Sequence, residues 1–316
     1  MMTLLTDATL QHTVNVFHAN NYNQRETAIA MVLSRSALQH RLKNAEERKI
    51  KPRVRVVAGA LEKEAALNIT RVVWFTDAHN QPGLNTERFE WLANFVNDQK
   101  PDYLIDGGDF DDMNSLCHYE RNDSWAGKFK PTFMADLEAS KIARDILDTK
   151  ITHPCEKHFI LGNHEDRLYQ FENLNPELYG MMQHAYEEIH HQWAMTRYRG
   201  YLDIAGVDFT HVPMNGMNRP MGGTRCAVQA AAKSIRDICF GHTHTYGYWE
   251  ETKLGPNRST TAICGGCFMP DKYVPKYAQG SAKGYWYGCH VVEIAEGTII
   301  GHTPITMREL KLRYGN

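Results

Sequence analysis

The chain lacks any uninterrupted apolar run of membrane-spanning length, and its first residues lack a basic segment followed by an apolar core. These two absences argue against a transmembrane helix and a secretory signal, so we expect a cytoplasmic protein. Internal repeats and low-complexity tracts are also missing. The net charge of −2 and the 42% share of hydrophobic residues are typical of a folded chain, neither disordered nor positively charged throughout.

Cysteine is sparse and scattered. Seven cysteines are an odd number for a chain of 316 residues, which predicts reduced thiols instead of a disulfide framework. Cys264 and Cys267 form one CxxC pattern without a second pair. We interpret them as small residues in a strand or turn, not as a zinc or redox site.

Positive charge is concentrated at the N-terminal end. Residues 1–55 hold nine Lys and Arg against four Asp and Glu, although the chain as a whole is slightly acidic. Length alone allows one large domain or two smaller ones. The basic segment indicates an anionic partner.

Residues 10–48 have a helical pattern, in which Ser34 is a candidate N-cap. The stretch 27–42 resembles a Fis-type helix-turn-helix. The small, capping and buried positions of that family are matched by Ala28, Ser34, Leu38 and Leu42. Val32 departs from the family, whose members usually have Gly in the turn.

The resemblance implies that Arg35, Gln39 and Arg41 are exposed and meet DNA, so DNA is the expected partner of residues 1–55. The alternative is a helical hairpin that docks protein, which would make the chain a homo-oligomer. The expected domains are a helix-turn-helix-like unit at 1–50, a linker at 51–69 with a strand from Val54 to Val57, and a catalytic unit at 70–316.

From Arg71 onward the sequence alternates between strand and helix patterns and becomes strand-rich after Gly241, which predicts a mixed pair of sheets flanked by helices. A β-hairpin is predicted in this strand-rich part, with its turn at Glu296 and Gly297. The predicted helices are Thr86 to Asn97, Pro131 to Leu147, Pro176 to Trp193 and Thr224 to Lys233.

Five short clusters of metal-binding residues follow in a constant order. Most come directly after an apolar stretch, so the side chains would lie where buried strands end and loops begin. The clusters are Asp77-Ala78-His79, Gly108 to Asp112, Gly162-Asn163-His164-Glu165, His211 and Gly241-His242-Thr243-His244. Together they indicate one site for two metal ions.

Such a site suits phosphate ester cleavage, which needs a nucleophile stronger than water and neutralisation of oxyanion charge. Two divalent cations about 3.5 to 4 Å apart provide both, by bridging and deprotonating one water and by clamping phosphate oxygens. Mixed oxygen and imidazole ligands favour transition metals over Mg or Ca. We expect two divalent ions, Mn first, with Fe, Ni or Zn as alternatives.

The five clusters, in this order, resemble the signatures of the calcineurin-like metallophosphoesterases: DxH, GDxxD, GNH(E/D), a lone His and GHxH. The resemblance covers residues 71–305 and implies a four-layer α/β/β/α sandwich. It implies that the first metal is held by Asp77, His79 and His244, the second by Asn163, His211 and His242, and that Asp109 bridges both.

The resemblance also implies that His164 faces the scissile phosphate without binding metal, and that Asp112 hydrogen-bonds His164. A carboxylate partner would raise the pKa of the imidazole and suit it to acid catalysis. His211 follows a strand-like run and is therefore preferred as the lone His. The polar stretch around the other candidates, His184, His190 and His191, favours surface positions for them.

The family indicates the reaction more firmly than the substrate. Protein phosphatases extend the second signature with Arg-Gly, whereas Met113 and Asn114 follow Asp112 here. With a basic helix-turn-helix at one end, the chain is interpreted as a DNA-directed phosphodiesterase or nuclease. The domain pairing resembles phosphoesterases encoded by bacteriophages, which would place the protein in the host cytoplasm. The alternative is a phosphomonoesterase whose N-terminal domain serves oligomerisation.

Overall fold

A computed structural model describes residues 7–19, 24–31, 33–50, 68–118, 127–223, 225–255, 258–275, 278–279 and 284–315. It divides into two compact units, Met1–Ala66 and Leu67–Asn316. The linker predicted at 51–69, with its strand from Val54 to Val57, lies outside the described residues apart from 68 and 69. No helix in the described part of the chain is long and apolar enough to cross a membrane.

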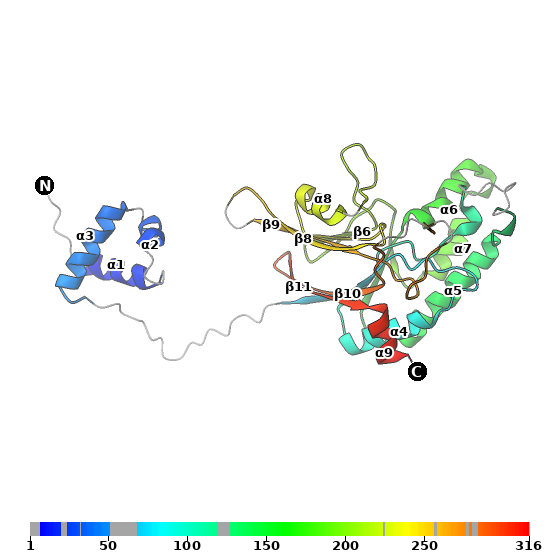
Figure 1. Ribbon diagram of the computed structural model, residues 1–316, viewed down its shortest axis with the longest axis horizontal. Helices are drawn as coiled ribbons and strands as arrows, with labels where there is room; N and C mark the ends of the chain where they lie inside the picture. Colours follow the sequence, from blue (N-terminus) through cyan, green and yellow to red (C-terminus); the bar gives the residue numbers. More distant parts are fainter. Residues whose placement is uncertain are drawn as a thin grey trace. The chain divides into compact units, whose positions relative to one another are not determined.

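The first unit consists of three helices, α1 (Asp7–Ala19), α2 (Gln24–Ala30) and α3 (Arg35–Glu47) (Figure 1). Ser34 caps α3, because its side chain accepts a hydrogen bond from the backbone N–H of Ala37. Leu38 is completely buried, and α3 packs against both other helices. The predicted helical character and cap are confirmed, whereas DNA contact stays a prediction and Val32 lies outside the described residues.

The second unit contains two mixed sheets. The six-stranded sheet has the order β11 (Thr298–Thr306), β10 (Gly288–Ala295), β1 (Thr70–Phe75), β2 (Tyr103–Asp106), β3 (Glu156–Ile160) and β4 (Ala194–Thr196). The five-stranded sheet has the order β5 (Leu202–Ile204), β6 (Val207–Thr210), β7 (Ile238–Phe240), β9 (Ser259–Gly265) and β8 (Tyr246–Thr252).

In one sheet β1, β2, β3 and β4 pair in parallel, and β10 and β11 add antiparallel strands beside β1. In the other sheet β6, β7 and β9 pair in parallel, and the edge strands β5 and β8 are antiparallel. The predicted hairpin is confirmed, since Ala295 pairs with Thr298 across Glu296 and Gly297, both at positive φ. Parallel strands bring their carboxyl ends to one edge of a sheet, where ligand sites form in open α/β sheets.

The sheets pack against each other and are covered by helices on their outer faces. In β1, Val72 and Trp74 pack in the core between the sheets, while Val73 and Phe75 pack in the core under the helices. This alternation follows from the two-residue period of a strand. Figure 1 shows α8 (Cys226–Lys233) over one sheet and α4 (Glu87–Gln99), α5 (Phe133–Lys150) and α9 (Met307–Tyr314) on the opposite side. The predicted four-layer sandwich is confirmed.

Helix boundaries differ from the predictions in informative places. Three predicted helices are present as α4 (Glu87–Gln99), α5 (Phe133–Lys150) and α8, whereas α6 (Asn163–Leu174) and α9 (Met307–Tyr314) were not predicted. The single helix predicted from Pro176 to Trp193 is wrong. It is a short turn at Pro176–Leu178 followed by α7 (Met181–Ile189), because Gly180 adopts a φ of 84° and breaks the helix.

The surface position predicted for His190 is also wrong, although His184 and His191 are exposed. His190 is completely buried, and its Nδ1 accepts a hydrogen bond of 2.9 Å from Nε of Arg144. Burial and the nearby guanidinium lower its pKa well below the ordinary value. The polar neighbours of His190 in sequence face solvent, but α7 ends here and turns this ring inward.

Arg144 also joins α5 to the end of β2 through a buried ion pair. Its Nη2 lies 2.8 Å from Oδ2 of Asp106, and both side chains are inaccessible to solvent. The guanidinium lies 3.8 Å from the ring centre of Phe110. Burial raises the pKa of Asp106 to about 6 despite this cation. The pair therefore anchors the strand that leads directly into the Gly108–Asp112 signature.

We expect Arg144→Met to lower the free energy of unfolding by about 3–5 kcal/mol, because Asp106 is left buried without its cation. Urea unfolding at pH 7 measures this loss. The control is Lys141→Met in the same helix, where Lys141 and Asp145 are both 56% exposed. It should change stability by less than about 1 kcal/mol. Equal unfolding midpoints for the two variants would contradict the anchoring role of Arg144.

Candidate metal centre

All five clusters predicted from the sequence come together at one edge of the sandwich. Asp77, Asp109 and Asn163 follow β1, β2 and β3 of one sheet. His211 and His242 follow β6 and β7 of the other. Because these strands run parallel within each sheet, their loops lie at the same end and the two sheets contribute ligands from opposite sides.

The loops carrying the first two clusters are held together by backbone hydrogen bonds. The N–H of Asp77 donates to the carbonyl of Gly108 at 2.8 Å, and the N–H of His79 donates to that of Asp109 at 2.9 Å. Left-handed backbone, with φ between 43° and 72°, is adopted by Asp77, His79, Asp109, His242 and His244. This conformation is unfavourable for residues with a Cβ atom and is typical of functional sites that the surrounding fold holds in place.

Two glycines of the signatures are required by the close approach of carboxylates. A Cβ atom at Gly162 would lie 2.1 Å from Oδ1 of Asp109. A Cβ atom at Gly241 would lie 2.2 Å from Oδ2 of Asp77. Any side chain at either position would displace a predicted metal ligand.

The first predicted ligand set converges on one point. Nε2 of His79 lies 2.9 Å from Nε2 of His244, which lies 3.2 Å from Oδ1 of Asp77. Two atoms bound to one transition-metal ion are about 3 to 3.5 Å apart, given bonds of about 2.0 to 2.2 Å. The spacing of the three side chains therefore fits a single divalent cation.

The second predicted set has the same spacing. Oδ1 of Asn163 lies 2.8 Å from Nδ1 of His242 and 3.1 Å from Nε2 of His211. The side chain of His211 is completely buried. Its Nδ1 lies 3.0 Å from the carbonyl of Gly107, which only accepts hydrogen bonds, so Nδ1 donates and Nε2 is free to bind a cation.

Asp109 lies between the two sets. Its Oδ2 is 3.8 Å from Nε2 of His79 and 3.4 Å from Nε2 of His211, while its Oδ1 accepts from the N–H of His164 at 2.9 Å. Burial alone would raise the pKa of Asp109, but the charges of His211 and His164 lower it well below its ordinary value. The position suits a bridging carboxylate, and the assignment of each ligand stays a prediction.

The site is rich in negative charge before any cation binds. Burial would lower the pKa of His79, yet hydrogen bonds to Asp112 and Asp77 raise it to about 10. Burial would also lower the pKa of His211, but the charge of Asp109 raises the pKa of this ring to about 9. In these two rings the carboxylates favour positive charge, whereas burial lowers the pKa of His242 to about 4 and that of His244 below its ordinary value. A concentration of carboxylates with neutral imidazoles is the environment that divalent cations prefer.

His164 and Asp112 lie beside the two sets. Nδ1 of His164 is 2.8 Å from the carbonyl oxygen of Asp112 and 3.2 Å from its carboxylate, which also lies 3.3 Å from Nδ1 of His79. The predicted pairing is present, but the carboxylate is shared between two histidines. Arg167, one helical turn beyond His164, places its Nη2 3.1 Å from Nε2 of that ring.

Glu165 is a positioning residue to which the sequence analysis gave no role. Its Oε2 accepts hydrogen bonds from the N–H groups of Asp109 and Gly162 at 3.0 and 2.7 Å, and its Oε1 accepts from that of Asp111 at 2.9 Å. Burial and the neighbouring carboxylates raise its pKa to about 8. One side chain therefore ties two signatures together. The only signal in the sequence is the acidic residue that ends Gly162-Asn163-His164-Glu165.

We expect Glu165→Gln to weaken Mn²⁺ binding about 10- to 100-fold, because an amide group turns at least one donor towards a backbone N–H and misplaces Asp109. Calorimetric titration of the metal-free protein with Mn²⁺ measures the change. The matched control is Glu172→Gln in the same helix, since buried Glu172 also accepts three backbone N–H bonds, from Gly180, Met182 and Gln183.

Both variants should lose stability in urea. Only Glu165→Gln should lose metal affinity, because the hydrogen bonds of Glu172 go to Gly180, Met182 and Gln183, none of which is a predicted metal ligand. Unchanged Mn²⁺ affinity in Glu165→Gln would refute the positioning role.

All seven cysteines are free thiols, and no cysteine belongs to a candidate metal cluster within the described residues. The described clusters are Asp77 with His79 and His244, Asp109 with His211 and His242, and His79 with Asp112 and His164. Cys264 lies near the end of β9, Cys267 follows that strand, and both are buried.

Comparison with known proteins agrees with this geometry. Residues 70–246 match the family described as calcineurin-like phosphoesterases. A search of curated proteins found no match. A similar solved structure is that of Yfce, described as a phosphoesterase from E. coli, with 14% identity and a TM-score of 0.35 over 74% of this chain and 98% of that one. Because the family match spans more than half of the sequence and includes all five signatures, the chain belongs to the calcineurin-like phosphoesterases and is a metal-dependent phosphoric ester hydrolase.

Proposed function

We propose that the protein is a dinuclear phosphodiesterase or nuclease that acts on DNA, with two divalent cations and Mn as the expected metal. The observation that carries the proposal is the pair of ligand sets on either side of Asp109. When bound, two cations in such a site supply Lewis acidity that activates water and neutralises phosphate charge. Asp77, His79 and His244 would hold one ion, and Asn163, His211 and His242 the other.

His164 is suited to move a proton at the leaving oxygen. Its Nδ1 is directed to Asp112, so its Nε2 is the atom that faces the centre, 3.9 Å from Oδ2 of Asp109. In this structure Nε2 accepts from Nη2 of Arg167, so it would carry a proton once the guanidinium turns to the phosphate. The Asp112 carbonyl and carboxylate orient the ring. His164 therefore acts as the catalytic acid, and Asp112 holds it in position.

Arg167 is a candidate contact for the phosphate. Its Nη1 donates to the carbonyl of Asp112 at 2.8 Å, which holds the guanidinium beside His164. Protein phosphatases of this family carry an Arg directly after the second signature, where this chain has Met113 and Asn114. Arg167 would supply comparable positive charge from α6, and its planar fork suits phosphate oxygens.

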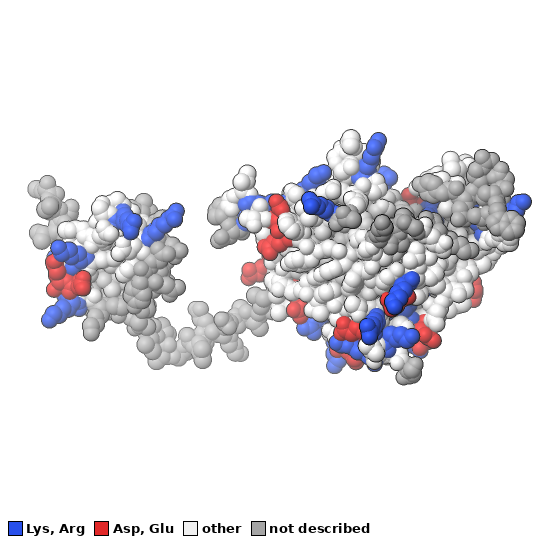
Figure 2. Space-filling model, in the orientation of Figure 1, with Lys and Arg blue, Asp and Glu red and all other residues white. Residues whose placement is uncertain are grey.

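The first unit supports DNA as the substrate. Arg35 and Gln39 are exposed and lie one helical turn apart on α3, as expected of a helix that meets a nucleic acid. Figure 2 shows Lys and Arg side chains on the visible face of this unit. Contacts to phosphates bind DNA without reading its sequence. We extend the proposal to a bacteriophage-type enzyme that works in the host cytoplasm.

One feature favours the alternative, a phosphomonoesterase whose first unit serves oligomerisation. A cavity of about 430 Å³ lies beside α1 and α3 and is lined in part by the apolar residues Val14, Phe17, Leu42, Ala45 and Ile50. A cavity with an apolar part and polar residues around it suits docking of another amphipathic helix. The salt dependence of DNA binding separates the two functions.

We expect His164→Ala to retain bound metal and to lose turnover most on substrates with poor leaving groups, because the missing proton donor matters least for an acidic phenol. Hydrolysis of a series of aryl phosphodiesters with Mn²⁺ measures this dependence. The loss should be about 100-fold or more for the least acidic phenol. His184→Ala is the exposed control. A uniform loss across the series would argue against acid catalysis.

Affinity for duplex DNA should fall steeply with salt, and Arg35→Ala should reduce the slope of log affinity against log salt by about 0.9 for one lost phosphate contact. Fluorescence anisotropy with the full chain measures both. Arg308→Ala, an exposed arginine on α9, is the matched control and should leave the slope unchanged.

Aryl phosphodiester hydrolysis should be the same in both arginine variants. If duplex affinity depends little on salt and a change in the first unit alters only the oligomeric state, the alternative function holds.

A further inference from the structure

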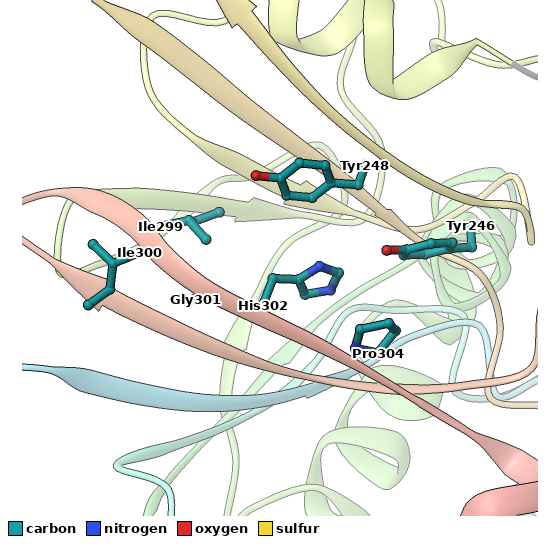
Figure 3. Close-up of a pocket in the computed structure, with 7 residues that line it drawn as sticks. All are labelled: Tyr246, Tyr248, Ile299, Ile300, Gly301, His302 and Pro304. Carbon is teal, nitrogen blue, oxygen red and sulfur yellow. The ribbon is translucent and has the colours of Figure 1, made fainter.

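A second cavity opens where the edge strands of the two sheets face each other. It has a volume of about 330 Å³ and lies between β8 and β11 (Figure 3). Its lining consists of Tyr246, Tyr248, Ile299, Ile300, Gly301, His302 and Pro304. None of these residues is charged, and Figure 2 shows a broad uncharged band across this face of the second unit.

The tyrosines enter the cavity because of strand alternation. Tyr246 and Tyr248 point to one face of β8, whereas Gly247 lies against α8, where a Cβ atom would come within 3.2 Å of Ala227. Trp249 is on the same outer face as Gly247 and is 43% exposed. Tyr248 is 48% exposed although it faces the other sheet. The edge of the sandwich is therefore lined by flat rings that remain accessible.

The rings from the two sheets are nearly parallel. Tyr248 and His302 have ring centres 5.8 Å apart and planes 7° apart. Tyr246 and His290 are related in the same way, at 5.8 Å and 16°. Trp286 extends the group, with its ring 4.9 Å from that of His290. Stacked rings with exposed faces offer a flat ligand a surface on which to continue the stack.

A hydrogen-bonded pair of histidines gives the cavity a defined polar group. Nε2 of His290 is 2.8 Å from the carbonyl of Gly265, which only accepts, so Nε2 carries the proton. Nδ1 of neutral His290 must then accept from Nε2 of His302, 3.0 Å away. His302 is thereby left with a lone pair on Nδ1, for which the described residues provide no hydrogen-bond donor.

Both histidines are neutral at physiological pH. Burial lowers the pKa of His302 to about 4, and burial together with His302 lowers that of His290 to about 3. With neutral rings and no Lys or Arg in the lining, the cavity does not suit a phosphate. A planar, uncharged group with an N–H donor fits the ring faces and the acceptor on His302.

We propose that the cavity between β8 and β11 binds an unpaired nucleobase that presents an amino group, by stacking on Tyr248 and donating to Nδ1 of His302. The inference rests on the proposed function, because it makes the base a neighbour of the phosphodiester that is cleaved. Bases in single strands have free faces, and stacking on aromatic side chains contributes about 1–3 kcal/mol per base.

The path from the cavity to the metal centre is short. His244 precedes Tyr248 by four residues, which span at most about 13 Å of extended chain. Tyr285 meets the ring of His244 edge-on at 4.7 Å, and the adjacent Trp286 belongs to the stacked group. A strand whose phosphate occupies the centre would therefore reach the cavity with a base one or two nucleotides away.

The test measures binding to the full chain without divalent cations. The probes are a five-nucleotide strand of deoxyadenosine and the same strand with abasic sugars. The wild type should bind the adenine strand about tenfold more tightly than the abasic one. Tyr248→Leu should remove most of this difference. Trp249→Leu, on the opposite face of the same strand, should keep it.

His302→Phe separates stacking from the hydrogen bond. It should still distinguish adenine from abasic strands, but it should lose the preference of the wild type for adenine over unsubstituted purine, which has no amino group. Urea unfolding confirms that each variant is folded.

Equal affinity of the wild type for adenine and abasic strands would overturn the proposal, as would an equal loss in Trp249→Leu. A change in sedimentation on Tyr248→Leu, with unchanged strand binding, would also overturn it and assign the edge to a second copy of the chain. Hydrolysis of an aryl phosphodiester is measured separately. Its failure would contradict the proposed phosphodiesterase function, whereas base discrimination is read without turnover.

Discussion

The structure of the site depends on the placement of one buried carboxylate, that of Asp109. Its backbone is held in left-handed conformation, its N–H is bound by Glu165, and the absence of a side chain at Gly162 leaves room for its oxygen. Each of these constraints is unfavourable or demanding by itself. Together they direct a negative charge to the point where histidines from two sheets converge. The strained backbone around Asp109 lowers the stability of the fold, and in return the cation site is already formed before any cation binds.

Much of the site could be predicted from sequence because its ligands come in short motifs after apolar strands. Asp77 and His242 follow β1 and β7, and parallel pairing brings the ends of the strands together whatever the length or conformation of the loops. The neighbourhood of His190 misled the prediction, since polar neighbours in sequence do not reveal the end of a helix. Helix α6 was missed because Gly162 provides no capping side chain, and Glu165 folds back onto the N–H of Gly162 instead.

The cavity between β8 and β11 could not be predicted, because it depends on how strands far apart in the sequence are placed in the two sheets. Tyr248 and His302 are 54 positions apart and carry no motif, so only the packing of two sheets makes them parallel neighbours. The tautomer of His302 likewise follows from a chain of hydrogen bonds that ends at the carbonyl of Gly265. Under the proposed function, the two sites would divide the recognition of a nucleic acid by charge. The carboxylate centre would take cations and phosphate, while the neutral cavity would take a base.

The central claim is that two cations share Asp109. The most direct measurement is anomalous scattering from a crystal of the full chain grown with Mn²⁺. The account predicts two peaks about 3.5 to 4 Å apart, one beside His79 and His244 and the other beside His211 and His242, with Asp109 between them. A single peak, or two peaks of which neither contacts Asp109, would contradict it.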